Sequence, residues 1–201
     1  MKEFKGKVAV ITGGASGLGL EIARLAATKG MKLVLSDIEE RALKAAELEF
    51  AGQGIEVLAV RTNVAIAEDV ELLAEKTVTR FGAVHLLFNN AGVALNKTAW
   101  ETTIADWEWV LGVDLWGVIH GIRVFTPIML KQDAPSHIIN TASVAGMLST
   151  QGMAAYNVAK HGVVTLSETL YHDLKRREAN IDVSVLCPAW VSTGIWDSAR
   201  N

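Results

Sequence analysis

The sequence predicts an α/β fold in which a parallel sheet carries helices on both faces. Short apolar runs, rich in β-branched residues and leucine, alternate along the chain with longer amphipathic runs. The short runs largely lack the polar–apolar alternation of strands with one solvated face, which is typical of parallel strands buried on both sides. Regular alternation of strand and helix builds such a sheet through crossover connections. Right-handed crossovers permit the doubly wound, Rossmann-type strand order 3-2-1-4-5-6.

Each predicted element has its own stretch of sequence. The apolar runs predict strands over residues 7–12, 32–37, 55–60, 84–89, 137–142 and 181–187. The amphipathic runs between them predict helices over residues 17–29, 39–51, 67–81, 104–131 and 153–178. No repeat, low-complexity tract or linker interrupts this order, so we expect residues 1–201 to form a single domain.

Composition narrows the function classes. Half of the 201 residues are hydrophobic and the formal net charge is −3. An acidic balance without a basic block argues against a nucleic-acid partner. No unbroken apolar run approaches the roughly 18 residues of a membrane span, and "MKEFKGK" is no signal peptide, so we expect a cytoplasmic protein without a membrane partner. The single cysteine, Cys187, is expected to be a buried, reduced thiol, and the five histidines lack metal-ligand spacing, so no metal site is expected.

The stretch "TGGASGLG" (12–19) follows the first strand directly and opens the first helix. Glycines there allow a sharp turn and the close approach of a pyrophosphate, and the unpaired N–H groups of a helix start attract phosphate. The spacing is Gly13-x3-Gly17-x-Gly19, and Leu20 stands where a P-loop would have lysine. The loop therefore favours a dinucleotide, with a tight turn that binds nothing as the alternative.

Asp37 ends the second strand, 18 residues after Gly19. A carboxylate at this place can accept hydrogen bonds from both hydroxyls of an adenosine ribose and would repel a 2′-phosphate. Ser16 and Ile38 stand where an NADP enzyme would want a basic residue. We therefore expect NAD, with NADP less favoured. The alternative is that Asp37 caps the following helix, because "SDIEE" opens it.

Three residues form a candidate catalytic group. Tyr156 and Lys160 in "YNVAK" are four residues apart and so share one helix face. A nearby ammonium favours the ionised phenol, which lets such a pair work as general base and acid. Ser143 lies at the carboxyl end of the fifth strand, where ligands bind in such sheets, and its hydroxyl can polarise a carbonyl.

Taken in order, "TGGASGLG", "NNAG" (89–92), Ser143 and "YNVAK" resemble the short-chain dehydrogenase/reductase family, over nearly the whole chain from residue 6. The resemblance implies that Tyr156 is the acid/base, that Ser143 orients the substrate oxygen and that Lys160 also holds the nicotinamide ribose. "TNV" resembles the adenine contact and "CPAWVST" the segment that fixes the nicotinamide carboxamide. With the glycine loop and Asp37, the implied cofactor-binding residues are Gly13, Ser16, Gly17, Leu18, Gly19, Asp37, Ile38, Asn63, Val64, Asn90, Ala91, Gly92, Tyr156, Lys160, Pro188, Val191 and Thr193.

The chain departs from the family pattern at Asp114 in "VDLWG", where the family usually has asparagine. That asparagine helps to hold a water in the proton relay to the lysine, so Asp114 joins the candidate catalytic residues. A carboxylate beside Lys160 would stabilise the ammonium and partly cancel its field at Tyr156. The relay is expected to survive with an altered pH dependence.

The second departure is the end at "WDSARN", since family members continue with a substrate-covering segment and a seventh strand. We expect that this strand is missing, that the sixth strand forms an apolar edge, and that the chain is truncated. Trp190 and Trp196 are candidates for the substrate entrance. By resemblance, helices 104–131 and 153–178 form a dimer face, so a homodimer or homotetramer is expected.

The sequence thus predicts a dinucleotide-binding catalytic domain that transfers a hydride between NAD and a small secondary alcohol or ketone. Two alternatives stay open. One is the same chemistry with NADP. The other is a dinucleotide-binding or scaffold protein with little turnover, suggested by Asp114 and the short C-terminus.

Overall fold

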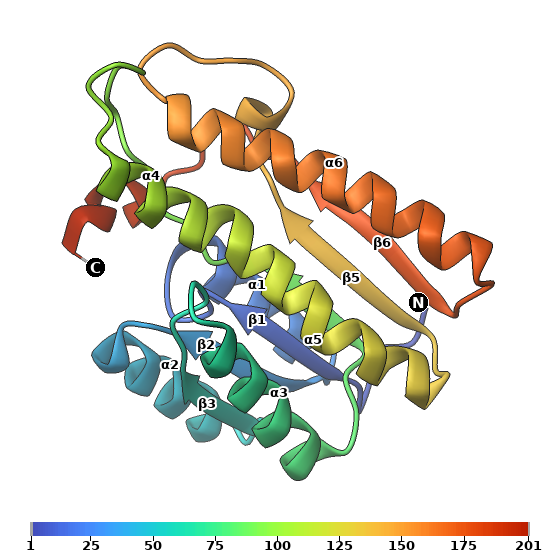
Figure 1. The fold of residues 1–201 in the computed structure, drawn as a ribbon. Helices are drawn as coiled ribbons and strands as arrows, with labels where there is room; N and C mark the ends of the chain where they lie inside the picture. The colour runs from blue at the N-terminus through green and yellow to red at the C-terminus, as the bar shows by residue number, and fades with distance from the viewer. Residues whose placement is uncertain (1, 201) are drawn as a thin grey trace.

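The computed structural model describes residues 2–200 and contains one six-stranded parallel sheet (Figure 1). The strand order is β3-β2-β1-β4-β5-β6, so the predicted doubly wound fold and its strand order are confirmed. The strands are β1 (Val8–Thr12), β2 (Lys32–Asp37), β3 (Val57–Arg61), β4 (Leu86–Asn89), β5 (Ser136–Thr141) and β6 (Ile181–Leu186).

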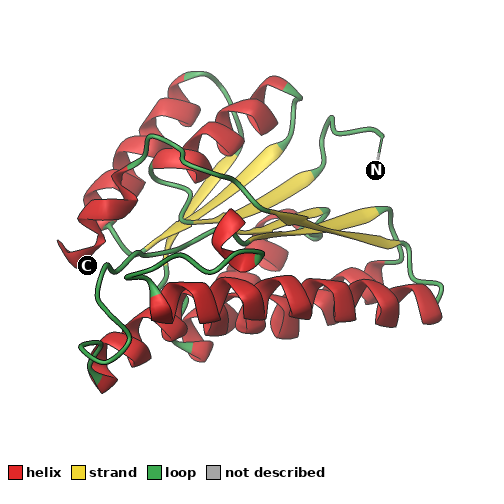
Figure 2. Cartoon of the chain, turned by 90° about the horizontal axis from the view of Figure 1, so that it is seen from above, coloured by secondary structure: helices red, strands yellow, loops and turns green. Residues whose placement is uncertain are grey.

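Helices cover both faces of the sheet (Figure 2). The helices are α1 (Gly17–Thr28), α2 (Glu40–Gly52), α3 (Ala67–Phe81), α4 (Ile104–Leu111), α5 (Gly117–Gln132) and α6 (Ala154–Arg176). The predicted helix 104–131 is two helices joined end to end by a π-helical turn, Gly112–Trp116. Such single turns of π-helix are rare and often lie at functional sites.

Alternate residues of β1 enter two different hydrophobic cores. Val8 and Val10 pack in one core with residues of α3 and α5, whereas Ala9 and Ile11 pack in the other with residues of α1 and α2. All five residues of β1 are buried. Burial on both faces explains why this strand reads as an unbroken apolar run.

The edge strand β6 differs from this pattern because its residues alternate between buried or half-buried and exposed, beginning with the buried Ile181. One of its faces packs under α6, while the other lacks a covering helix among the described residues (Figure 2). Cys187, directly after β6, is half-buried, so the prediction of a buried thiol was wrong in degree. The prediction for Cys187 assumed that helices cover both faces of the sheet at β6, and among the described residues only one face is covered.

The segment Ile104–Gln132 is long and apolar enough to cross a membrane by length and composition, since an 18-residue window within it has a mean hydropathy of 1.3. In the fold it lies against the sheet beside α3 and α6 (Figure 1). Phe125 and Met129 are buried in the core that holds Val8 and Val10, and Val110 is buried in the cluster around Tyr156. A packed core helix has the same composition, so the fold accounts for its apolar character.

Candidate active site

The carboxyl ends of β1 and β4 are fastened together by one side chain. The Thr12 hydroxyl accepts hydrogen bonds from the backbone N–H groups of Asn90 (2.9 Å) and Ala91 (3.0 Å), and donates to the Phe88 carbonyl (3.3 Å). The Asn90 side chain donates back to the Thr12 carbonyl at 3.0 Å. The two loops that follow these strands therefore form a single rigid floor at the edge of the sheet where ligands bind in this architecture.

The glycine turn rests on this floor, and its glycines are required by the geometry. Gly13 and Gly17 have φ angles of +63° and +49°, a region that side chains rarely adopt. A Cβ on Gly19 would stand 2.0 Å from the Gly13 carbonyl oxygen. Ser16 takes the N-cap position of α1 without a side-chain cap bond, so the hydroxyl leaves the first N–H groups of α1 open. The turn thus fits a phosphate group at the start of a helix.

Asp37 links the end of β2 to the glycine turn. One carboxylate oxygen accepts from the Ala15 N–H and the other from the Glu39 N–H, both at 3.1 Å. Burial raises the pKa of this carboxyl, while the backbone hydrogen bonds oppose the rise. Glu39, not Asp37, takes the N-cap position of α2. Asp37 therefore joins the glycine turn to the start of α2 without itself being the N-cap residue.

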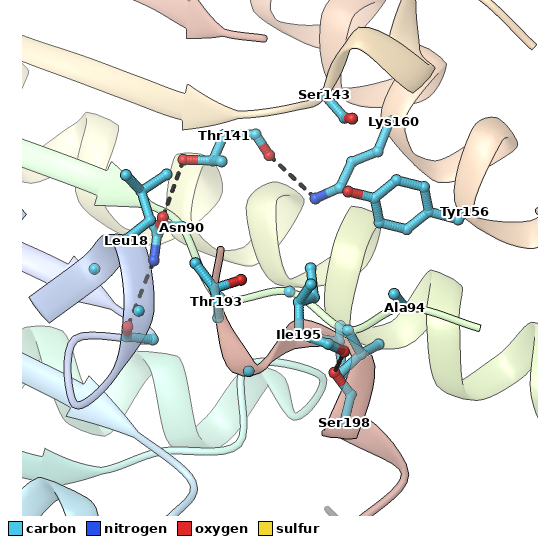
Figure 3. A pocket seen from close by; sticks show the side chains of 18 of the residues that line it. Leu18, Asn90, Ala94, Thr141, Ser143, Tyr156, Lys160, Thr193, Ile195 and Ser198 are labelled. Carbon is cyan, nitrogen blue, oxygen red and sulfur yellow. Dashed lines mark hydrogen bonds between the residues drawn. The ribbon is translucent and has the colours of Figure 1, made fainter. Parts of the chain in front are cut away.

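Tyr156 and Lys160 lie one turn apart on α6, and the Lys160 ammonium is 5.4 Å from the centre of the Tyr156 ring. Both are buried, and the Lys160 ammonium donates to the Thr141 carbonyl at 3.1 Å. Ser143 faces them from the loop after β5 (Figure 3). Its oxygen accepts from the Ala145 N–H at 3.1 Å, which orients the hydroxyl.

Asp114 lies behind this group, in the π-helical turn, and is fully buried. One carboxylate oxygen accepts from the Val93 N–H at 2.7 Å, and the other is 3.5 Å from the Lys160 ammonium without another polar partner among the described residues. Burial raises the pKa of this carboxyl, and the nearby ammonium opposes the rise. The loop at Gly92 packs directly beside this pair, because a Cβ there would be in van der Waals contact with the carboxylate at 3.4 Å.

One cavity of about 460 Å³ joins the glycine turn to the tyrosine. In Figure 3, Leu18 and Asn90 lie towards one end and Tyr156 and Ala94 towards the other. Every residue predicted for the cofactor, together with Ser143, lines this cavity, and Asp114 alone of the predicted set stands outside the wall. The lining residues from that set are Gly13, Ser16, Gly17, Leu18, Gly19, Asp37, Ile38, Asn63, Val64, Asn90, Ala91, Gly92, Ser143, Tyr156, Lys160, Pro188, Val191 and Thr193.

The segment after β6 lies across the middle of the cavity. The Pro188 carbonyl accepts from the Val144 N–H at 3.0 Å, so this segment is tied to the loop that holds Ser143. At its far end Thr193 approaches the glycine turn, because a Cβ on Gly17 would be 3.2 Å from the Thr193 side chain. The segment can therefore hold a ligand that spans from the turn to Tyr156.

Sequence reasoning missed several residues of this site. Thr12 was not recognised, although it precedes the glycines directly. Asn157 was not recognised either: its amide donates to the Thr150 carbonyl at 2.7 Å and so fixes the loop that leads into α6. The apolar wall around Tyr156 was also missed, because isolated alanine, methionine and tryptophan residues carry no motif. Its members include Ala94, Trp109, Met153 and Ile195.

A doubly wound sheet with a glycine turn after β1 and a Tyr–Lys pair across the strand ends is the arrangement of a dinucleotide-dependent oxidoreductase. The family model for short chain dehydrogenases matches residues 7–201, and the chain belongs to that family.

Known relatives agree with this assignment. The chain is 40% identical over 201 residues to a CLA biosynthesis dehydrogenase/reductase of Lactiplantibacillus plantarum, covering all of this chain and 70% of that protein. It is 35% identical over 193 residues to a cyclohexanol dehydrogenase of an Acinetobacter species, covering 95% of this chain and 75% of that protein. Among solved structures, a short chain dehydrogenase/reductase from Burkholderia phymatum in complex with NAD is 52% identical, with a TM-score of 0.98 over all of this chain and 71% of the other. The chain is therefore an oxidoreductase of a family with NAD-bound members.

Proposed function

We propose that this protein transfers a hydride between NAD and a secondary alcohol or its ketone. The observation that carries the proposal is the single cavity with the glycine turn at one end and Ser143, Tyr156 and Lys160 at the other. The dinucleotide, when bound, accepts or supplies the hydride. The cyclohexanol dehydrogenase among the relatives acts, by its name, on a neutral secondary alcohol, which supports the substrate class.

Tyr156 is the proposed acid/base. Its hydroxyl takes the proton from the alcohol during oxidation and returns it to the ketone oxygen during reduction. The Lys160 ammonium favours the ionised phenol through its positive charge. The Ser143 oxygen accepts a hydrogen bond from the Ala145 N–H, which leaves its single O–H group to donate to the substrate oxygen. This hydrogen bond holds the reacting carbon in place and stabilises the negative charge that develops on its oxygen.

The dinucleotide would be held along the floor of the cavity. The turn Gly13–Gly19 and the start of α1 would bind its pyrophosphate, and Asn63 and Val64 would flank the adenine. Asn90 would border the nicotinamide ribose together with Lys160. Val191 and Thr193 would contact the carboxamide from the segment above.

NAD is the proposed cofactor rather than NADP. Asp37 places a carboxylate beside the glycine turn, and both of its oxygens keep lone pairs for ribose hydroxyls beyond their single backbone hydrogen bonds. The same charge would repel a 2′-phosphate, and neither Ser16 nor Ile38 offers a compensating cation.

Asp114 is proposed to tune the proton transfer. Its carboxylate competes with Tyr156 for the field of the Lys160 ammonium, from which it is 3.5 Å away. We further propose that the protein is cytoplasmic, and that it forms a homodimer or homotetramer through α5 and α6, in line with a family that is typically oligomeric.

Nicotinamide absorbance with NAD and NADP, followed over a panel of secondary alcohols and ketones, tests the proposal. We expect turnover with NAD and a lower kcat/KM with NADP. A higher kcat/KM with NADP would contradict the assignment of Asp37. Tight dinucleotide binding with no turnover across the panel would favour a binding or scaffold role.

A further inference from the structure

The tyrosine end of the cavity is built from apolar side chains. Tyr156 packs in a hydrophobic cluster with Val93, Ala94 and Met153, and Trp109 and Ile195 pack against this cluster. In Figure 3, Ala94 and Ile195 lie below the Tyr156 ring and away from Leu18. The groups that flank a substrate's reacting carbon would therefore meet hydrocarbon and aromatic surface.

Few charged side chains line the cavity, and their arrangement is unfavourable to an anionic substrate. Among the described residues that line the cavity, only Asp37, Glu108 and Lys160 carry a charge. Lys160, the single cation, is buried and already engages Asp114 and the Thr141 carbonyl. Among the wall residues that the structure describes, a carboxylate or phosphate on the substrate would thus find no cation that is free to pair with it.

Two tryptophans extend the apolar surface outward. Trp190 and Trp196 both line the cavity and stack with their ring centres 5.8 Å apart. Trp190 is 79% exposed and Trp196 47% exposed, so each side chain keeps open surface for an incoming group. Exposed aromatic surface at the mouth of a cavity favours contact with another apolar group.

We infer that this end of the cavity accepts an uncharged, apolar-flanked alcohol or ketone and rejects one that carries an anionic group on the ring or chain flanking the reacting carbon. The inference names the substrate class of the proposed function and rests on it. Removing a carboxylate from water without a partner is costly, and the acidic Glu108 adds repulsion. An apolar substrate instead gains from covering the aromatic mouth.

A matched pair of ketones tests the inference. 4-Oxocyclohexanecarboxylate carries its charge across the ring from the carbonyl, and its methyl ester is neutral and of similar shape. We expect kcat/KM of the wild-type protein with NADH to be at least about tenfold higher for the ester, because only the acid must lose the hydration of its charge. Equal or faster reduction of the acid would overturn the inference while leaving the proposed function intact.

Measuring binding without turnover separates the inferred substrate preference from the proposed hydride transfer. Calorimetry with the Tyr156→Phe variant and NADH measures the affinity for each ketone when proton transfer is blocked. Tighter binding of the ester supports the inference, and it does so even if the wild-type protein reduces neither ketone, in which case the proposed function alone would fail. Equal affinities, or no binding of the ester, would overturn the inference.

A charge placed in the wall completes the test. Ile195→Lys adds a flexible ammonium beside the tyrosine end, and Ile195→Met is the neutral control of similar length. The half-buried position of Ile195 in a surface segment makes both variants compatible with folding. We expect the lysine variant alone to lower the ratio of kcat/KM for the ester to kcat/KM for the acid by about tenfold or more. This is the range of a charge-assisted hydrogen bond. A ratio unchanged from that of the methionine variant would contradict the electrostatic explanation.

Discussion

The two ends of the cavity are built by different means. At the glycine turn the backbone forms the surface, and Thr12, Asn90 and Asp37 fasten it with hydrogen bonds to the ends of three neighbouring strands. At the tyrosine end side chains form the surface, and most of them come from residues 93–94, 150–153 and 188–198, with Glu108 and Trp109 added by α4. The first end is fixed by the sheet, whereas the second depends on loops. A cofactor common to a family suits the first design, and a substrate that varies among relatives suits the second.

Tyr156→Phe should break the chemistry while leaving both surfaces in place. The ring keeps its packing with Ala94 and Met153, and only the hydroxyl is lost. We expect kcat to fall by about 10²–10⁴-fold, the usual contribution of general acid–base catalysis, with the Kd for NAD unchanged. Steady-state rates and a dinucleotide titration measure the two quantities. A rate within about twofold of the wild-type rate would remove Tyr156 from the proposed mechanism.

Gly19→Ala should damage the other end selectively. The added methyl would lie 2.0 Å from the Gly13 carbonyl oxygen and 2.7 Å from the Asn90 amide nitrogen, so the turn must shift. Overpacking of this kind costs about 1–3 kcal/mol, which corresponds to a Kd for NAD that is weaker by roughly fivefold to 150-fold if the cost falls on the bound conformation. Gly52→Ala is the control, because a Cβ there meets nothing within 4 Å. Similar dinucleotide affinity in the two variants would show that the turn is not a tight cradle.

Asp37→Ala combined with Ile38→Arg should change which dinucleotide the first end prefers. The double variant removes the repelling carboxylate and adds a guanidinium suited to a phosphate. We expect the ratio of kcat/KM for NADP to that for NAD to rise by about tenfold or more, as for a hydrogen bond to a charged group. The single Ile38→Arg variant separates gained attraction from lost repulsion. Wild-type preference for NADP would show that Asp37 does not face the ribose.

The difference between the two ends also explains which parts of the site could be predicted from the sequence. The glycine turn, Asp37 and the Tyr–Lys pair are encoded by residue types at fixed spacing, because backbone geometry and helix periodicity set those distances. The strand order followed from the same alternation of elements. The π-helical turn at Asp114 left no periodic signal in the sequence, since apolar helical residues both precede it and follow it. The wall formed by Trp109 and Ile195 depends on contacts between distant segments, which no local pattern records.

Asp114→Asn tests the coupling of charge between Asp114 and Lys160, with a smaller expected effect on rate. The amide keeps the shape and removes the charge that faces the Lys160 ammonium at 3.5 Å. More of the ammonium's field then reaches Tyr156 and favours the ionised phenol. We expect activity to persist and the rising limb of the pH–rate profile for alcohol oxidation to move to lower pH. An unmoved profile would mean that Asp114 is already uncharged, in the direction in which burial shifts its pKa. Movement to higher pH would show the sign of the argument to be wrong.

Asn157→Ala should give the smallest change and confine it to the loop-built end. The Asn157 amide, buried beside Tyr156, donates to the Thr150 carbonyl at 2.7 Å, and the Gly152 carbonyl accepts from the Lys97 N–H at 2.8 Å. These two bonds fix the loop that carries Thr150 and Met153 into the cavity wall.

Losing the Asn157 hydrogen bond removes about 0.5–1.5 kcal/mol of the free energy that holds the loop in place. If this cost falls on ketone binding, the KM for the ketone should be higher by roughly twofold to tenfold. The Kd for NAD should not change, because the glycine turn is held by other bonds. Val158→Ala is the control, since that neighbouring side chain is 51% exposed. A loss confined to kcat, or one shared with the Val158 variant, would show that Asn157 acts on α6 itself. An elevated KM with unchanged dinucleotide affinity would establish that the two ends of the cavity can be altered independently.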